Sequence, residues 1–325
     1  MKTKWIRQAG AWSAGWVAVS MAWAGPGDWL AREAAVQRTL AQAPACQNLG
    51  DYYWEIGDAR GALLHGQHGY SIRQEKVIPL ASASKWVFGA YVAQREGGRL
   101  SLSEMAALEM LSGYDELQPL LCKGSETGRA CFARGDNNNF NPEHVGKFSY
   151  NGGHDQKLLI DLGLGDIDSA ALTTELQARL GADVDIRFNT PEPAGGMAAA
   201  PAAYAHFLRK IMRGDLVINR LLGAHPVCTL PGSCTSAVQS PSPYAWHYSL
   251  NHWVEDDPKG DGAFSSAGAF GFYPWISADK ALYGIFARQS YLPDAGMKSA
   301  ECGALVRKAF VSAGSGPIPL SSSLR

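Results

Sequence analysis

The sequence lacks the signatures of several common enzyme classes. It contains no G-x-S-x-G segment, the turn that carries the nucleophile of α/β-hydrolases, which argues against a catalytic triad on that fold. Its eight histidines form no H-E-x-x-H or comparable cluster, and neither a P-loop nor a G-x-G-x-x-G motif is present. We therefore expect no metal and no cofactor.

Charge is also scarce. Asp, Glu, Lys and Arg make up 18% of the 325 residues, and the formal net charge at pH 7 is -1. A protein with this balance lacks the basic surface of a nucleic-acid binder, so we expect no nucleic-acid partner. Hydrophobic residues reach 46%, which is enough for a large core in one big domain or two interleaved lobes.

Residues 1–24 have the pattern of a signal peptide. They open with three basic residues, Lys2, Lys4 and Arg7. An apolar stretch follows over residues 9–23, and Ala22-Trp23-Ala24 suits signal peptidase. A membrane anchor is the alternative, but the stretch is short for a bilayer and polar residues interrupt it. Cleavage would leave 26 basic against 30 acidic residues, a net charge of -4, on a periplasmic or extracellular protein without a membrane span.

Six cysteines without a C-x-x-C motif indicate disulfides in an oxidising compartment. Fifteen pairings are possible, and spacing favours Cys122–Cys131, Cys228–Cys234 and, for the remaining two, Cys46–Cys302. The first two bridges would each close a short loop bounded by Gly or Pro. The third would join the two ends of the mature chain, where loop-closure entropy predicts a stabilisation of about 4–5 kcal/mol. The alternative is that some of these thiols stay free.

Strand patterns lie toward both ends of the chain, and helical patterns lie between them. We predict strands over 52–56, 62–65, 244–254, 263–276 and 281–289, and helices over 28–42, 82–96 and 298–311. We expect an α/β (α+β) fold in which residues 25–325 form a single catalytic domain. One antiparallel sheet would be built from both chain ends, about 25–75 and 240–315, and flanked by helices. A helical lobe of about 76–239 would be inserted, and 315–325 would be a disordered tail.

The predicted helix 82–96 begins with an S-x-x-K motif, Ser82-Ala83-Ser84-Lys85. Residues three apart on a helix share a face, so Lys85 could take the hydroxyl proton of Ser82. A lysine in a partly dry setting can lose its charge, and a free N–H at the helix start can bind an oxyanion. A helix cap followed by a solvated lysine is the alternative, but it fits poorly with a helix that is apolar nearly all round. A second copy, Ser277-Ala278-Asp279-Lys280, falls between two predicted strands, where Asp-Lys suits a hairpin turn.

Two further segments hold candidate site residues. Tyr150 precedes Asn151 and Gly152, and a phenol near a cationic lysine can act as a general acid or base; an ordinary loop tyrosine is the alternative. The segment Ser266-Ala267-Gly268-Ala269 lies in a predicted strand. Its small residues would let a substrate approach the backbone, whose N–H can face an oxyanion. The alternative is a glycine-rich bulged strand.

The order of these motifs resembles that of the serine β-lactamase and DD-peptidase superfamily, which includes the penicillin-binding proteins. The likeness is to its class C-like branch, which includes family VIII-type esterases, and it runs from about Tyr53 to Phe310. The flanking segments that carry it are Ile78–Ala81, Gly98–Leu102 and Gly195–Met197. The resemblance implies a β-lactamase-like fold and attack on an ester or amide carbonyl, with an acyl-serine that water then hydrolyses.

The resemblance also implies a role for each candidate residue. Ser82 would be the acylated nucleophile and Lys85 its activator, while Tyr150 would stand at the tyrosine of Y-x-N. Ser266-Ala267-Gly268 would stand at K-T-G or H-x-G, and the oxyanion hole would be the backbone N–H groups of Ser82 and Ala269. Residues expected to contact the substrate are Asn151, Gly152, Ser266, Ala267, Gly268, Trp246 and Trp253. For the two tryptophans, core packing is an equal alternative.

The chain departs from the superfamily pattern at two positions. Gly152 replaces the asparagine of Y-x-N, and Ser266 replaces the cation that binds the substrate carboxylate in β-lactamases and DD-peptidases. A hydrogen bond to a charged partner contributes about 1.5–3 kcal/mol, so without this cation the protein should bind acidic substrates less tightly. We therefore expect an exported esterase or amidase whose substrate is a small, less acidic ester, amide or peptide. One alternative is a DD-peptidase or class C-like β-lactamase with a cation supplied from elsewhere, for example Arg288. The other is a binding or sensor protein on the same scaffold that has lost its chemistry.

Overall fold

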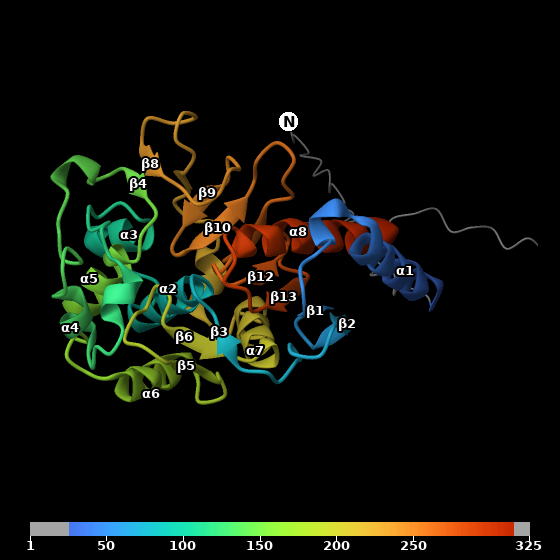
Figure 1. Cartoon of the computed structure of the whole chain (residues 1–325), viewed down its shortest axis with the longest axis horizontal. Helices are drawn as coiled ribbons and strands as arrows, with labels where there is room; N and C mark the ends of the chain where they lie inside the picture. The colour runs from blue at the N-terminus through green and yellow to red at the C-terminus, as the bar shows by residue number, and fades with distance from the viewer. Residues whose placement is uncertain (1–25, 315–325) are drawn as a thin grey trace, which may run out of the picture.

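The computed structural model describes residues 26–314 (Figure 1), so the expected signal peptide, 1–24, and the expected tail, 315–325, lie outside the described residues. The helices are α1 (Pro26–Gln42), α2 (Ala83–Arg95), α3 (Leu102–Leu108), α4 (Gly128–Phe132), α5 (Gly153–Asp161), α6 (Ser169–Leu180), α7 (Pro201–Met212) and α8 (Ala295–Ala313). The strands are β1 (Tyr52–Gly57), β2 (Ala62–His68), β3 (Ile78–Pro79), β4 (Phe148–Ser149), β5 (Ile186–Phe188), β6 (Met197–Ala199), β7 (Val227–Cys228), β8 (Ala237–Gln239), β9 (His247–Ser249), β10 (His252–Glu255), β11 (Ala263–Ser265), β12 (Phe272–Ile276) and β13 (Tyr283–Arg288).

One large sheet organises the molecule, in the order β2-β1-β13-β12-β11-β10-β9-β7. Strand β1, near the start of the chain, pairs antiparallel with β13, near its end, in the register Tyr52 opposite Arg288. The segment between β2 and β7 supplies α2 to α7 and the three-stranded sheet β3-β6-β5, while β4 of the same segment pairs with β8, which follows β7. The predicted architecture, an antiparallel sheet built from both chain ends with a helical lobe inserted, is therefore confirmed.

The central strands of this sheet are buried on both faces, as a sheet covered by helices on each side requires. Successive residues of β12 point to opposite faces, and Phe272 joins one hydrophobic cluster while Tyr273 joins another. Helix α8 packs on one face of β12 and β13, whereas α2 and α7 pack on the other. This alternation explains why the aromatic pattern of these segments predicts strands so clearly.

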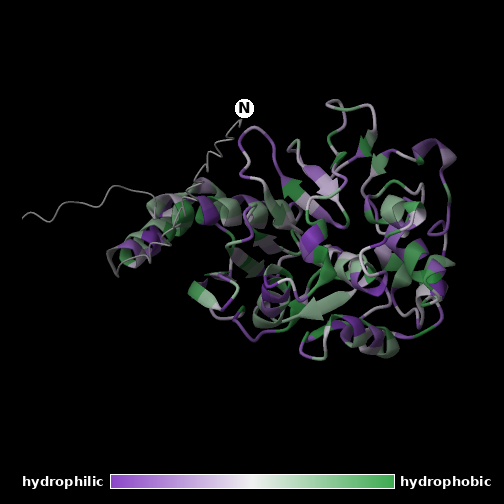
Figure 2. Ribbon diagram, turned by 180° about the vertical axis from the view of Figure 1, so that it is seen from behind, coloured by the Kyte–Doolittle hydropathy of each residue, from purple (hydrophilic) through white to green (hydrophobic). Residues whose placement is uncertain are grey.

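Helix α1 lies alongside α8 at one end of the molecule, where both carry hydrophilic and hydrophobic residues (Figure 2). A disulfide joins Cys46, just after α1, to Cys302 in α8 across a sequence separation of 256. The other bridges of the structure are Cys122–Cys131 and Cys228–Cys234, so all six cysteines are paired as the spacing predicts. The first and last helices of the domain are thus joined covalently as well as by packing.

Two of the segments predicted as single strands each form two strands, so these predictions are wrong. The segment 244–254 forms a hairpin, β9 and β10, because Leu250 and Asn251 adopt left-handed backbone conformations with φ of 40° and 67°. The segment 263–276 is divided into β11 and β12 by a loop over 266–271, in which Gly271 adopts φ 99°. The predicted last helix begins three residues earlier than expected, at Ala295.

No helix in the described part of the chain is both long enough and apolar enough to cross a bilayer.

Candidate active site

Ser82 lies at the N-terminus of the most deeply buried helix. It is the residue before α2, whose side chains from Ala83 to Ala93 are all buried. The neighbouring Ala81 has a φ of 47°, a left-handed conformation that is unfavourable for a side chain with a Cβ and typical of functional sites. The turn is held because Leu80 N–H donates to the carbonyl of Met197 at 2.9 Å. The backbone strain therefore lies at Ala81, while Ser82 itself has helical geometry with φ -62° and ψ -13° at the start of α2.

Lys85 lies one turn further along α2, and its side chain is only 4% exposed. Its Nζ is 3.2 Å from Ser82 Oγ and donates to the carbonyl oxygen of Ala194 at 3.0 Å. The same nitrogen lies 4.7 Å from the centre of the Tyr150 ring. The structure thus brings together Ser82, Lys85 and Tyr150, three residues that the sequence separates by up to 68 positions.

Tyr150 is positioned by strand pairing and by a buried histidine. It follows β4, which runs parallel to β8, and its N–H donates to the carbonyl of Gln239 at 3.2 Å. His154 is fully buried, with Nε2 2.8 Å from the carbonyl oxygen of Ser149. Burial lowers the pKa of His154 to about 4, so it is neutral at physiological pH and holds Tyr150 in place without adding a charge.

The small-residue motif packs directly on Ser82. Ser266 Oγ donates to the carbonyl oxygen of Ser82 at 3.1 Å. At Gly268 a Cβ would lie 2.0 Å from the carbonyl oxygen of Leu80, so only glycine fits there. The motif lies in the loop between β11 and β12, and its Ala269 comes to the same pocket as Ser82. Tight packing explains the small residues at these positions.

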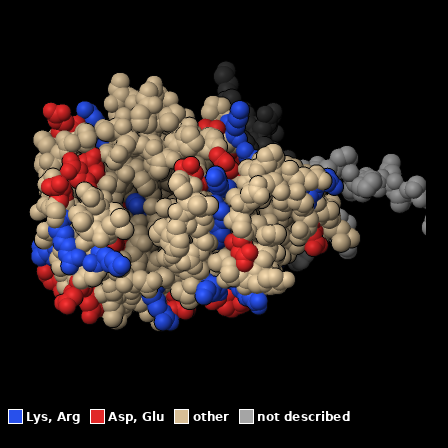
Figure 3. Space-filling view, viewed as in Figure 1, with Lys and Arg blue, Asp and Glu red and all other residues tan. Residues whose placement is uncertain are grey.

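A pocket of about 240 Å³ opens beside Ser82. Its lining residues are Ser82, Tyr150, Pro241, Trp253, Ala267, Ala269, Asp294, Gly296 and Met297. The backbone N–H groups of Ser82 and Ala269 donate to no protein acceptor among the described residues. Figure 3 shows a hollow in one face of the molecule, with mostly uncharged walls and a Lys or Arg side chain at its floor. A serine hydroxyl, a lysine and two free N–H groups at one cavity are the parts that acyl transfer requires.

Two buried carboxyl groups lie within electrostatic range of Lys85. Asp155 is fully buried and accepts a hydrogen bond from Asn251 Nδ2 at 2.7 Å, while its Oδ2 has no partner among the described residues. Burial raises the pKa of Asp155 to about 7, an effect that the Lys85 charge opposes. Burial also raises the pKa of Glu192, again against the influence of Lys85. Lys85 therefore acts electrostatically on two buried acids that the motif search did not reveal.

Several candidate residues lie close to the pocket without lining it. Asn151 uses its side chain within the protein, accepting from the N–H groups of Leu117 and Gly153 at 2.9 and 2.8 Å. Next to it, Gly152 faces the methyl group of Ala194 rather than the pocket. These contacts join the start of α5 to the loop around Leu117.

The two candidate tryptophans occupy different places. Trp253 lines the pocket and stacks on Tyr150 with ring centroids 5.4 Å apart. Trp246 packs edge-on against Trp253, and its Nε1 donates to Asp257 at 2.8 Å. The aromatic wall of the pocket is therefore Trp253, with Trp246 behind it.

The second S-x-x-K copy forms the turn between β12 and β13. Lys280 N–H donates to the carbonyl of Ser277 at 2.8 Å, and Lys280 Nζ donates to the carbonyl of Asn219 at 2.6 Å. Ser277 Oγ donates to Asp279 at 2.6 Å. This copy has the local geometry of a hairpin turn, as its sequence predicts.

Arg288, considered above as a source of cationic charge, is 4% exposed and does not line the pocket. Its guanidinium donates to the carbonyls of Leu49 and Ala295 and to Ser299 Oγ at 2.7, 2.9 and 2.8 Å. Burial lowers its pKa. This arginine anchors the start of α8 and is not available to a substrate.

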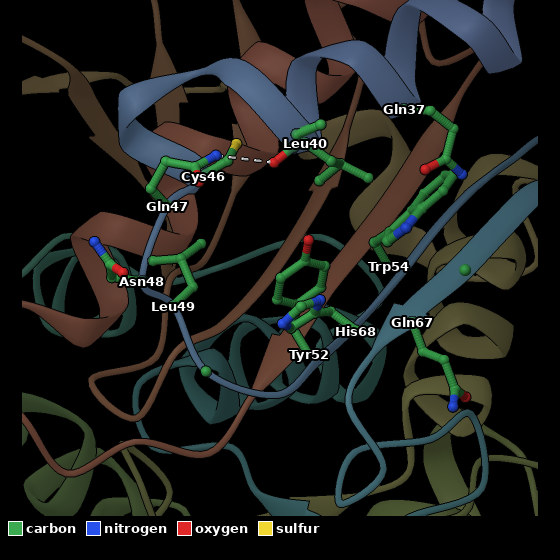
Figure 4. A pocket seen from close by; sticks show the side chains of 13 residues that line it. Gln37, Leu40, Cys46, Gln47, Asn48, Leu49, Tyr52, Trp54, Gln67 and His68 are labelled. Atoms are coloured by element: carbon green, nitrogen blue, oxygen red, sulfur yellow. Dashed lines mark hydrogen bonds between the residues drawn. The ribbon is translucent and has the colours of Figure 1, made fainter.

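A second cavity lies between α1 and the edge of the sheet (Figure 4). It measures about 540 Å³ and is lined by residues that include Gln37, Tyr52, Trp54 and His68, but by none of the candidate site residues. Tyr52 stacks on His68 there, with ring centroids 5.4 Å apart. Within residues 26–314 no group of acidic, histidine or cysteine side chains is arranged to hold a metal ion.

No protein-family model matches the sequence, and no curated protein matches it. Solved structures do match over most of their length. EstCE1, described as a hydrolase with promiscuous acyltransferase activity, is 11% identical with a TM-score of 0.64, over 87% of this chain and 99% of that one. A D-amino acid amidase from Ochrobactrum anthropi SV3, complexed with L-phenylalanine, is 12% identical with a TM-score of 0.63, over the same shares.

A β-lactamase from Mycobacterium bovis is 15% identical with a TM-score of 0.55, over 86% of this chain and 99% of that one. Identities this low establish the fold and not the activity. Since all three matches cover nearly the whole of the matched chain, the likeness extends over the sheet and the helical lobe together. The chain has the β-lactamase-like fold that these three structures share.

Proposed function

We propose that this protein is an exported serine hydrolase that cleaves an ester or amide through an acyl-serine intermediate, with Ser82 as nucleophile. The observation that carries the proposal is the contact between Ser82 Oγ and Lys85 Nζ at 3.2 Å beside a pocket. A serine at a helix start needs no lysine beside it for structural reasons. The fold shared with a hydrolase that has acyltransferase activity and with an amidase is compatible with this activity.

In the proposed first step, Ser82 Oγ attacks the substrate carbonyl carbon. Its proton moves to Lys85 Nζ, which accepts it when neutral. The carbonyl oxygen becomes an oxyanion and receives hydrogen bonds from the N–H groups of Ser82 and Ala269, which have no protein acceptor. Collapse of the tetrahedral intermediate breaks the bond to the alcohol or amine, which leaves with the proton.

In the second step, water attacks the acyl-serine and releases the acid. The water gives one proton to the Lys85 and Tyr150 pair, and Ser82 recovers its own proton as the ester bond breaks. Tyr150 lies over Lys85 and lines the same pocket as Ser82. We assign it to proton transfer at the leaving group, for which a phenol at the pocket wall is suited.

Export is part of the proposal. Three disulfides fit an oxidising compartment, and we propose that residues 1–24 direct the chain there and are removed after Ala24. N-terminal sequencing of the secreted protein should give Gly25 as its first residue.

The test is steady-state hydrolysis of p-nitrophenyl butyrate and of nitrocefin. The mature protein should turn over the ester, and Ser82→Ala should abolish that turnover. Ser277→Ala is the matched control, since it removes the serine of the other S-x-x-K segment, and it should retain the wild-type rate. Equal rates in the Ser82→Ala and parent proteins would overturn the proposal. A nitrocefin rate above the ester rate would replace the esterase with a β-lactamase.

A further inference from the structure

The pocket beside Ser82 has a single charged lining residue among those that the structure describes, and that residue is acidic. Asp294 is exposed at the pocket wall, where the other lining residues are apolar, aromatic or hydroxyl-bearing. Lys85 lies behind the nucleophile and does not line the pocket. A substrate that enters therefore meets one carboxyl group at the pocket wall.

The carboxylate of Asp294 is not used by the protein. It occupies the N-cap position of the long helix α8, yet its side chain makes no capping hydrogen bond. No ion pair or side-chain hydrogen bond joins Asp294 to any described residue, including Lys298 one turn along the helix. An aspartate at an N-cap position ordinarily accepts hydrogen bonds from the first N–H groups of its helix. Because Asp294 accepts none, helix capping does not explain why an aspartate stands here.

The backbone explains why the cap is not made. Asp294 adopts φ 61° and ψ 11°, the left-handed region, whereas a capping residue ordinarily has an extended backbone. Aspartate tolerates the left-handed region better than most residues with a Cβ. At the start of α8, the Arg288 guanidinium donates to the carbonyl of Ala295, the residue after Asp294, and to Ser299 Oγ.

We infer that Asp294 binds a cationic group of the substrate, so that the enzyme selects an ammonium-bearing ester or amide, such as an amino acid derivative. This inference rests on the proposed hydrolase function and specifies its substrate class. The acyl carbonyl would sit at Ser82, and its apolar side chain would lie between Trp253 and Met297. The ammonium group would donate to the Asp294 carboxylate, a charge-assisted hydrogen bond. A carboxylate at the same place on the substrate would be repelled.

Three methyl esters that differ in one substituent test this directly. They are phenylalanine methyl ester, as both enantiomers, methyl 2-methyl-3-phenylpropanoate and the monomethyl ester of benzylmalonic acid. These place an ammonium, a methyl or a carboxylate group on the same carbon. We expect kcat/KM to fall in that order, by about tenfold at the first step, as one charge-assisted hydrogen bond predicts.

Asp294→Asn keeps the shape, and asparagine tolerates the left-handed backbone. It should lower the ratio of kcat/KM for the ammonium ester to that for the methyl-substituted ester by about tenfold, mainly through KM. Asp294→Lys should reverse the order and favour the half-ester. Asp168→Asn is the matched control, because it makes the same charge change at the start of α6, away from the pocket, and should leave the ratio unchanged.

The failures of the two proposals are distinguishable. If p-nitrophenyl butyrate and the three methyl esters are all left intact, the hydrolase function itself fails. If p-nitrophenyl butyrate is cleaved by Ser82 but the three esters show no charge preference, or Asp294→Asn leaves the ratio as it is, the assignment of Asp294 is overturned.

Discussion

Asp155 should make the protein less stable as the pH rises, and replacing it with asparagine should remove that effect. The carboxyl group is fully buried, its Oδ1 is bonded to Asn251, and its Oδ2 has no partner among the described residues. Burial raises its pKa from 3.8 to about 7. Because the folded pKa is the higher one, the folded state keeps a proton that the unfolded chain has lost between these pH values.

The direction and size of the effect follow from that difference. Below the unfolded pKa both states are protonated, and Asp155 carries no penalty. As pH rises through the folded pKa the penalty becomes complete. A pKa change from 3.8 to about 7 corresponds to an upper limit of about 4 kcal/mol at 1.36 kcal/mol for each pH unit. Relaxation around the ionised group lowers this, so we expect about 2–4 kcal/mol.

The assay is urea unfolding followed by tryptophan fluorescence, with the disulfides intact, at about pH 4 and about pH 8. The unfolding free energy of Asp155→Asn minus that of the parent should increase between the two pH values by the expected amount. Asn at this position can still accept the hydrogen bond of Asn251, so the variant is close in shape. Taking the difference cancels other titrating groups, such as His154.

Asp161→Asn, an exposed position on the same helix, is the control and should show no comparable change. A difference that is the same at both pH values would mean that Asp155 titrates in the fold as it does in the unfolded chain. That result would refute the conclusion that burial governs its ionisation.

Three further predictions follow from the geometry. Lys85→Met should lower kcat for ester hydrolysis by at least about a hundredfold with a small effect on KM, as loss of a general base predicts, in the steady-state assay; an unchanged kcat would remove Lys85 from the mechanism. Gly268→Ala should lower turnover and should lower the unfolding free energy by about 1–3 kcal/mol, because its Cβ would lie 2.0 Å from the carbonyl oxygen of Leu80, close to Ser82. Gly61→Ala, with nothing within 4 Å, should be tolerated as its control. The double variant Cys46→Ala, Cys302→Ala should lower the unfolding free energy by about 4–5 kcal/mol, since the bridge closes nearly the whole domain, and a loss below about 1 kcal/mol would contradict the loop-entropy account.

The residues that the sequence predicts most directly are those related by local geometry. Ser82 and Lys85 lie three positions apart on one helix, so their contact follows from the motif and the helix together. The contact of Tyr150 with Lys85 spans 65 positions and followed only from the resemblance to a known family. Nothing in the local pattern around this tyrosine distinguishes it from an ordinary loop residue.

Other features depend on backbone conformations that composition does not signal. The turn at Leu250 and Asn251 is left-handed at both positions without a glycine, so the aromatic residues on either side resemble one strand. That turn also brings Asn251 to Asp155, 96 positions away. The pair is a consequence of the fold as a whole, and no sequence motif points to it.

The charges around Ser82 also bear on Ser266, where the chain differs from the K-T-G or H-x-G pattern that its sequence resembles. The Ser266 hydroxyl donates to the carbonyl of Ser82 and so supports that residue. A cationic side chain at the same position would instead reach toward a substrate carboxylate. The nearest arginine to that loop, Arg288, is held by backbone carbonyls and fixes the start of α8. Through its bond to the carbonyl of Ala295, Arg288 fixes the residue that follows Asp294. We therefore expect Arg288→Met to weaken the preference for an ammonium ester and to lower the stability of the fold. A variant that keeps the full preference would show that Asp294 is positioned independently of Arg288.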